Sequence, residues 1–150
     1  MKLSIETFFS HKNAPLYQAG ALLLVIVIGN LIGLLVEASG LKTFDDLFPW
    51  VISGSILLAF TLLNTLIGLN TDAKMNVYYG KSLIGFLGLA LGAAVLAKTF
   101  SSYSLGEAGS MWWIYIVITI GYLIFLGMMM LMRAIVTFAQ REDENLRHKK

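Results

Sequence analysis

The stretch 19-AGALLLVIVIGNLIGLLV-36 is apolar apart from Asn30 and its glycines. With its flank from Leu16 it is long enough, at about 1.5 Å per helical residue, to cross a hydrocarbon core about 30 Å thick. Three similar stretches follow along the chain. The sequence therefore predicts an all-α integral membrane protein with four transmembrane helices, which cover residues 16–39, 47–69, 77–97 and 111–132.

The composition also favours a membrane location. Apolar residues make up 57% of the chain and charged residues 13%, about half the charged share of a typical soluble domain. Lipid is therefore expected to surround the apolar surface of the folded chain. The chain has no cysteine, which excludes disulfides and thiolate metal sites. The formal net charge of +2 gives no reason to expect nucleic acid as a partner.

Residues 1–15 are predicted to form an interfacial segment before the first span. Asn13 and Pro15 favour a helix start, because asparagine can cap a helix and proline is tolerated in its first turn. A cleaved signal peptide is the alternative, since residues 36–38 loosely resemble a cleavage site. The apolar run is longer than a typical signal core, which favours a retained helix.

Residues 133–150 are predicted to be a helical tail that continues the fourth span. Asp143 lies four residues before Arg147, a spacing that places opposite charges on the same helix face. Arg141 and Arg147 are the residues through which this tail is expected to make contacts. The whole chain is predicted to be one membrane domain, because no other segment is long enough to build a separate core.

Lysine and arginine divide unevenly between the two sides that four spans create. Nine of the eleven fall on one side: Lys2, Lys12, Lys74, Lys81, Arg133, Arg141, Arg147, Lys149 and Lys150. The other side holds Lys42 and Lys98. The positive-inside rule then predicts that both termini and the 70–76 connection are cytoplasmic. The expected location is the inner (plasma) membrane.

The chain also resembles itself after a shift of 63 residues. The shift superposes Asn13 on Asn76, Gly29 on Gly92 and Trp50 on Trp113, and the first two spans on the last two. The predicted arrangement is two parallel-repeat hairpins. A chance match of these few residues is the alternative, since apolar spans always look somewhat alike.

This pattern resembles the YjfL-like family, small bacterial inner-membrane proteins of duplicated hairpins whose function is unassigned. The resemblance covers residues 13–97 and lies in Asp46, Trp50, Asp72, Asn76 and the glycine-bearing span 81–96. It implies an envelope-associated or membrane-stress context. No catalytic residue can be transferred from the family.

Small residues are the expected contacts between the helices, because apolar burial drives little association in lipid. The predicted packing residues are Gly29, Gly33, Gly85, Gly88 and Gly92, most of them in GxxxG spacing. They fit contacts within one bundle, and also contacts between copies of the chain.

Three polar residues, Asn30, Thr61 and Asn64, fall within the predicted spans. An unpaired amide in hydrocarbon costs a few kcal/mol, so both asparagines are expected to find partners. They could bond each other or a backbone carbonyl, line a hydrated path, or meet a polar partner subunit. Gly33 and Glu37 follow Asn30 on the same helix face, toward the predicted outer surface.

The sequence gives no sign of enzyme chemistry. His11 and His148 lie at opposite ends of the chain, so no metal site, catalytic group or cofactor site is predicted. The predicted function is noncatalytic: a polytopic membrane protein that assembles by helix packing, as a homo-oligomer or as a subunit of a larger membrane complex. The alternative is an oligomeric channel or carrier, with a path lined by the embedded Asn and Thr residues.

Overall fold

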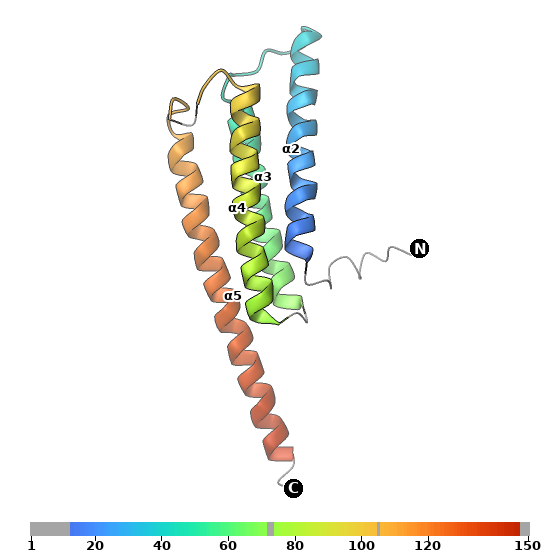
Figure 1. Ribbon diagram of the computed structural model, residues 1–150, viewed down its shortest axis with the longest axis vertical. Coiled ribbons are helices and arrows are strands. Elements are labelled where there is room, and N and C mark those ends of the chain that lie inside the picture. Colours follow the sequence, from blue (N-terminus) through green and yellow to red (C-terminus); the bar gives the residue numbers. More distant parts are fainter. Residues whose placement is uncertain (1–12, 72–73, 105, 148–150) are drawn as a thin grey trace, which may run out of the picture.

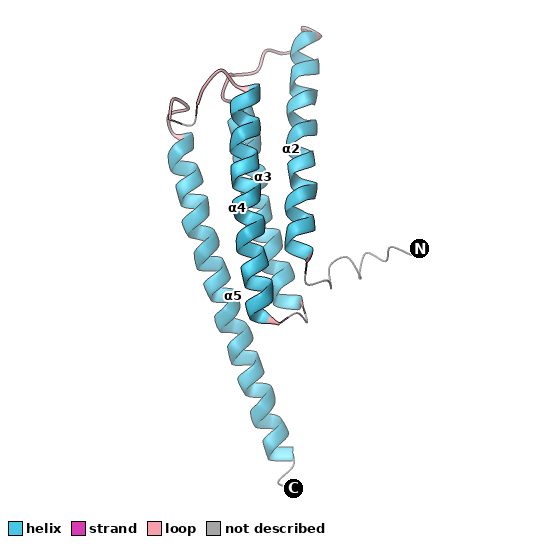
Figure 2. Ribbon diagram, in the orientation of Figure 1, coloured by secondary structure: helices cyan, strands magenta, loops and turns pink. Residues whose placement is uncertain are grey.

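A computed structural model describes residues 13–71, 74–104 and 106–147 of the chain (Figure 1). These residues form four helices and no strand (Figure 2): α2 (Ala14–Ala38), α3 (Phe48–Asn70), α4 (Met75–Phe100) and α5 (Met111–Arg147). All four are long and apolar enough to cross a membrane, which confirms the prediction of an all-α chain with four helices of that kind. Most of the predicted interfacial segment, and both histidines, lie outside the described residues.

The start of α2 is only partly as predicted. Pro15 occupies the first turn of the helix, where its missing N–H costs nothing. Asn13 occupies the N-cap position, as predicted, but its side chain makes no capping hydrogen bond. Its oxygen instead accepts a hydrogen bond from Lys81 Nζ of α4. Asn13 therefore ties the start of α2 to a neighbouring helix.

The helices form an up-and-down bundle in which α2 packs against α3 and α4, and α3 packs against α4 and α5 (Figure 1). We call the end where α2 begins and α5 leaves the tail end. The opposite end, which carries the connections 39–47 and 101–110, is the double-loop end. Because α2 and α3 run in opposite directions, the second half of α2 lies near the double-loop end and the second half of α3 lies near the tail end.

The last helix, α5, continues beyond the rest of the bundle, and it includes the predicted tail as far as Arg147 (Figure 1). Its 37 residues span about 55 Å at the usual helical rise. A hydrocarbon core is only about 30 Å thick. Near the tail end, Arg133 Nη2 donates a 2.7 Å hydrogen bond to the carbonyl oxygen of Thr71, where α3 has just ended.

Three aromatic rings from different helices meet in the core, a cluster that the sequence analysis did not predict. Tyr122 of α5 stacks on Phe86 of α4 with the ring centroids 4.4 Å apart. The same ring makes an edge contact with Phe60 of α3 at 6.0 Å. All three side chains are buried. Rings packed in this way contribute about 0.5–1.5 kcal/mol per pair beyond their burial, so the cluster holds α5 on the bundle.

The two tryptophans that the 63-residue shift superposes have different surroundings. Trp50 is 1% exposed and its indole N–H donates a 3.2 Å hydrogen bond to the carbonyl oxygen of Tyr103. Trp113 is 66% exposed. Trp50 thus fastens the 101–110 connection to α3, a role that Trp113 does not share. The internal repeat remains a prediction from the sequence.

Candidate functional site

A buried polar cluster surrounds Asn64, in the half of the bundle nearer the tail end. The Asn64 Oδ1 atom accepts a 3.0 Å hydrogen bond from the Tyr122 hydroxyl, and its Nδ2 lies 3.4 Å from Oε1 of Gln18. The Tyr78 hydroxyl donates a 2.8 Å hydrogen bond to the Asn64 backbone carbonyl. We call these four residues the Asn64 cluster. It joins all four helices through neutral hydrogen-bonding groups.

The sequence analysis found one member of this cluster and missed the other three. Asn64 stood out as an amide inside an apolar span. Tyr78 and Tyr122 carried a usable signal, because a buried tyrosine hydroxyl usually has a hydrogen-bond partner. Gln18 lies near the start of α2, where a polar residue is unremarkable. None of these side chains supplies a charge at neutral pH, so the cluster is suited to holding helices together.

Thr61 does not join the Asn64 cluster, although it is buried one turn away on the same helix. Its hydroxyl donates a 2.7 Å hydrogen bond to the carbonyl oxygen of Leu58, three residues earlier in α3. Such a bond satisfies a polar side chain without a partner from another helix. The hydroxyl of Thr65 does the same, at 2.7 Å from the Thr61 carbonyl.

Asn30 lies in the other half of the bundle, away from Asn64. Its Nδ2 donates a 2.9 Å hydrogen bond to the carbonyl oxygen of Ile26 in its own helix. Its Oδ1 is buried without a hydrogen-bond partner among the described residues. The two asparagines therefore do not bond each other. The Asn30 side chain donates a hydrogen bond to a backbone carbonyl of its own helix, whereas the Asn64 side chain bonds side chains of other helices.

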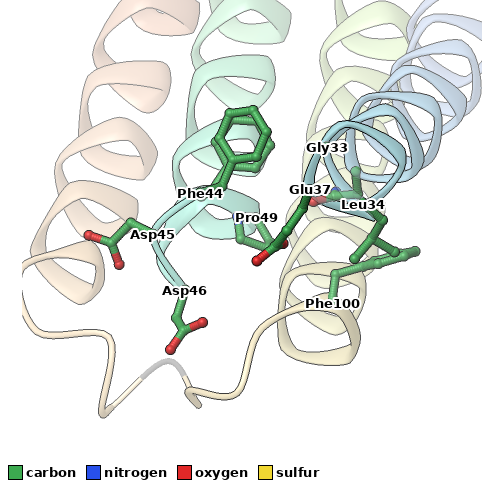
Figure 3. Close-up of a pocket in the computed structure, with 10 residues that line it drawn as sticks. Gly33, Leu34, Glu37, Phe44, Asp45, Asp46, Pro49 and Phe100 are labelled. Carbon is green, nitrogen blue, oxygen red and sulfur yellow. The ribbon is translucent and has the colours of Figure 1, made fainter. Parts of the chain in front are cut away.

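Asn30 lines a pocket at the double-loop end, between α2 and the start of α3. The pocket has a volume of about 50 Å³, and Gly33, Glu37, Phe44 and Asp46 contribute to its walls. Figure 3 shows Glu37 reaching from α2 toward Pro49, whereas Asp45 and Asp46 point away from one another. The predicted stripe of Asn30, Gly33 and Glu37 thus forms one wall of this pocket.

The predicted packing glycines face neighbouring helices within the chain, with one exception. A Cβ on Gly29 would lie 3.5 Å from Ile52, and one on Gly33 2.7 Å from the Phe48 ring, both of α3. A Cβ on Gly85 would lie 3.0 Å from the Pro15 carbonyl oxygen, and one on Gly92 2.7 Å from Leu23, both of α2. Gly88 is exposed and has nothing within 4 Å. The tightest glycine, Gly68 of α3, was not among those predicted.

The residues that the structure describes contain no group of three or more His, Asp or Glu side chains that could hold a metal ion. Comparison with known proteins adds no relative: no family model matches the chain, and neither the curated proteins nor the solved structures give a match. The resemblance to the YjfL-like family stays a prediction from the sequence pattern, and function must be argued from the residues.

The 101–110 connection contains a small hydrogen-bonded turn around Glu107. The Ser104 hydroxyl and backbone N–H donate to Glu107 Oε2 at 2.7 and 2.9 Å. These two bonds, the hydroxyl first, lower the pKa of Glu107 below its usual value of 4.5, and the positive charge of Lys98 adds a smaller effect. Desolvation opposes them. The turn therefore favours the ionised carboxylate.

We expect the Glu107 carboxyl to titrate below pH 4.5 in the folded protein, in an NMR pH titration. Because the folded pKa is depressed, the stabilisation is fully present above the unfolded pKa and is lost as the pH falls through the folded value. Ser104→Ala removes the larger cause and should raise the midpoint. An unchanged midpoint in this variant would show that the hydroxyl bond does not hold the carboxylate.

Proposed function

We propose that the chain is a small noncatalytic membrane protein that assembles through its helices, as a homo-oligomer or as a subunit of a larger membrane complex. We place it in the inner membrane with both termini in the cytoplasm, in an envelope-associated context. The positive-inside rule supports this orientation, because Lys81, Arg133, Arg141 and Arg147 all belong to the tail end.

The observation that carries the proposal is an exposed apolar stripe along α5. It consists of Ile124, Met128, Leu131, Ile135 and Phe138, each at least half exposed in the single chain. The residues follow one another at steps of four and three, the spacing by which one helix packs against another in a coiled coil. The stripe lies on the side of α5 away from its buried residues Tyr122, Leu126 and Met129.

The C-terminal end of this stripe distinguishes a contact with lipid from a contact with a second helix. Within the membrane, apolar residues on an outer helix face need no partner but lipid. Ile135 and Phe138 follow Arg133, which bonds Thr71 at the end of α3, and they are 59% and 69% exposed. Beyond that level α5 no longer has α3 or α4 beside it (Figure 1). A second helix laid along the stripe would remove both side chains from headgroups and water.

The last turns of α5 are charged and fully open to solvent. Arg147 Nε lies 3.8 Å from the Asp143 carboxylate, at the predicted spacing, with both side chains more than 70% exposed. Such a surface pair contributes little to stability. Arg141 is exposed as well. These charges keep the end of the helix soluble and are available to a cytoplasmic partner.

Substitution of the stripe beyond the membrane tests the proposal. Ile135→Ser and Phe138→Ser should each weaken assembly by about tenfold or more, because burying a large apolar side chain contributes about 1.5–3 kcal/mol. The measurement is the mass of the detergent-solubilised or nanodisc-embedded particle against protein concentration, with any companion protein identified.

Val136→Ser is the matched control, because it makes a similar change on another face of the same turn. It should leave the particle mass unchanged. A wild-type particle that holds one copy and no companion, in mild detergent and in nanodiscs alike, would contradict the proposed assembly.

The alternative, a channel or carrier, has less support from the geometry. A path lined by Asn30, Thr61 and Asn64 would need these groups to share one space. Asn30 belongs to the double-loop half and Asn64 to the tail half, and Thr61 bonds within its own helix. Asn30 is thus separated from the other two residues, and the Thr61 and Asn64 side chains are both engaged in hydrogen bonds within the bundle.

A further inference from the structure

The exposed apolar stripe of α5 has the residue order of a parallel coiled coil. Its steps of four and three alternate without interruption from Ile124 to Phe138, which is heptad spacing. In that spacing Met128 and Ile135 occupy position a, and Leu131 and Phe138 occupy position d. A β-branched residue at a with leucine at d favours a pair of parallel helices over larger assemblies. Leu131 and Ile135 meet this condition at the centre of the stripe.

Two glycines on the same side of α5 leave room for a second helix. Gly121 continues the stripe three residues before Ile124, and Gly127 lies between Ile124 and Leu131 at its edge. A Cβ on either glycine would meet nothing within 4 Å in the described part of the chain. Glycine weakens a helix relative to alanine, but small residues let membrane helices approach one another closely. This face of α5 is therefore shaped for close approach.

The membrane restricts how two copies of the chain can meet along this stripe. Every copy has the same distribution of lysine and arginine, so every copy is inserted with the same end inward. Two α5 helices then leave the membrane on the same side, and they run parallel. Such a pair has twofold symmetry about the membrane normal, so each residue of the stripe meets its own counterpart.

The first charged residues beyond the apolar stripe are complementary to themselves in such a pair. Glu142 follows Phe138 by four residues and occupies the next position a. In parallel helices the hole that receives this side chain includes the residue just before its counterpart, which is Arg141 of the second copy. Both side chains are exposed, and neither has an ion-pair partner within the described residues. Symmetry makes the contact twice, so two arginines offset the two neighbouring glutamates.

We propose that the partner of α5 is the α5 helix of a second copy, in a parallel pair joined at its charged end by reciprocal contacts between Arg141 and Glu142. The inference rests on the proposed function, which it narrows from assembly in general to a homodimer. An unrelated apolar helix would cover the stripe as well, because the hydrophobic effect is not directional. The reciprocal charge contact is the feature that selects a copy of the same chain.

Disulfide cross-linking in isolated membranes tests the geometry of the pair. The chain has no cysteine, so a single introduced cysteine can be oxidised only with one from another molecule. Ile135→Cys and Phe138→Cys should each give a band at twice the chain mass under mild oxidation. Parallel pairing brings equal positions within the Cα separation of about 4.4–6.8 Å that a disulfide needs. Val136→Cys, on another face of the same turn, should stay at the mass of one chain.

Exchange of the two charges tests what selects the partner. Arg141→Glu and Glu142→Arg should each raise the dimer Kd by about tenfold, because each places like charges opposite one another twice in the dimer. The double variant restores the complementarity and should return the Kd to within about threefold of the wild-type value. Glu144→Arg is the matched control, because it reverses an exposed charge on the opposite face of α5. The Kd is measured from particle mass against protein concentration in detergent.

The results separate the homodimer from assembly in general. A two-copy particle whose Kd the double exchange does not restore would overturn the reciprocal contact and leave assembly standing. Equal cross-linking of Val136→Cys and Ile135→Cys, or a particle with a companion protein or with more than two copies, would likewise overturn the parallel pair alone. A particle of one copy without a companion would contradict the proposed function as well.

Discussion

Gly68→Leu is expected to destabilise the bundle by about 3 kcal/mol, at the upper end of the cost of overpacking a core. A Cβ at this position would overlap the Met129 sulfur of α5 and lie 2.8 Å from Cε1 of Tyr78. Methionine can move aside because its side chain is flexible. Tyr78 cannot move as easily, since its hydroxyl is bonded to the Asn64 carbonyl at 2.8 Å. A leucine must therefore push α5 or α4 away from α3.

The measurement is equilibrium unfolding in mixed micelles, with Gly88→Leu as the matched control. Gly88 has nothing within 4 Å, so the added side chain meets only lipid. Leucine also favours helix over glycine by about 0.5–1 kcal/mol, so this control should be neutral or slightly stabilising. Equal unfolding free energies for the two variants would contradict the close packing of α5 at Gly68. A lower particle mass for Gly88→Leu alone would instead place a contact between copies on α4.

The sequence was sufficient to predict the four helices, because a long apolar run has one stable solution in lipid. It could not predict which faces of those helices are buried. Leu57 is fully buried and Leu58 is 47% exposed, yet both are leucines in the same apolar stretch. In a soluble protein the polar residues would mark the outer face. Lipid removes that signal, so the packing of α5 on α3 had to come from the structure.

The glycine and asparagine predictions show the same limit. The small-residue pattern identified Gly29, Gly33, Gly85 and Gly92, which do face other helices, but also Gly88, which does not. It missed Gly68, whose role depends on Met129 and Tyr78 from other helices. Spacing along one helix cannot reveal what a second helix brings to it. For the same reason, the sequence marked both asparagines as needing partners but could not show that they would find them in different halves of the bundle.

The Asn64 cluster supplies the second large effect. Asn64→Leu should lower the unfolding free energy by about 2 kcal/mol, because it leaves the buried Tyr122 hydroxyl without its acceptor. Tyr122→Phe should cost about 1 kcal/mol through loss of the same bond. The double variant should then cost less than the two single losses together, by about 0.6 kcal/mol and at most about 1.7 kcal/mol, the average and the largest coupling measured for hydrogen bonds between membrane helices.

Tyr78→Phe provides the control, because the Tyr78 hydroxyl bonds the Asn64 backbone carbonyl, which every substitution at position 64 retains. Its cost should add to that of Asn64→Leu almost without coupling. Additive costs for Asn64 and Tyr122 would show that their 3.0 Å bond contributes nothing to the bundle. The same variants separate a structural amide from a transport path: liposomes that hold the wild-type protein should stay impermeable to ions. Ion flux that Asn64→Leu abolishes would favour the channel instead.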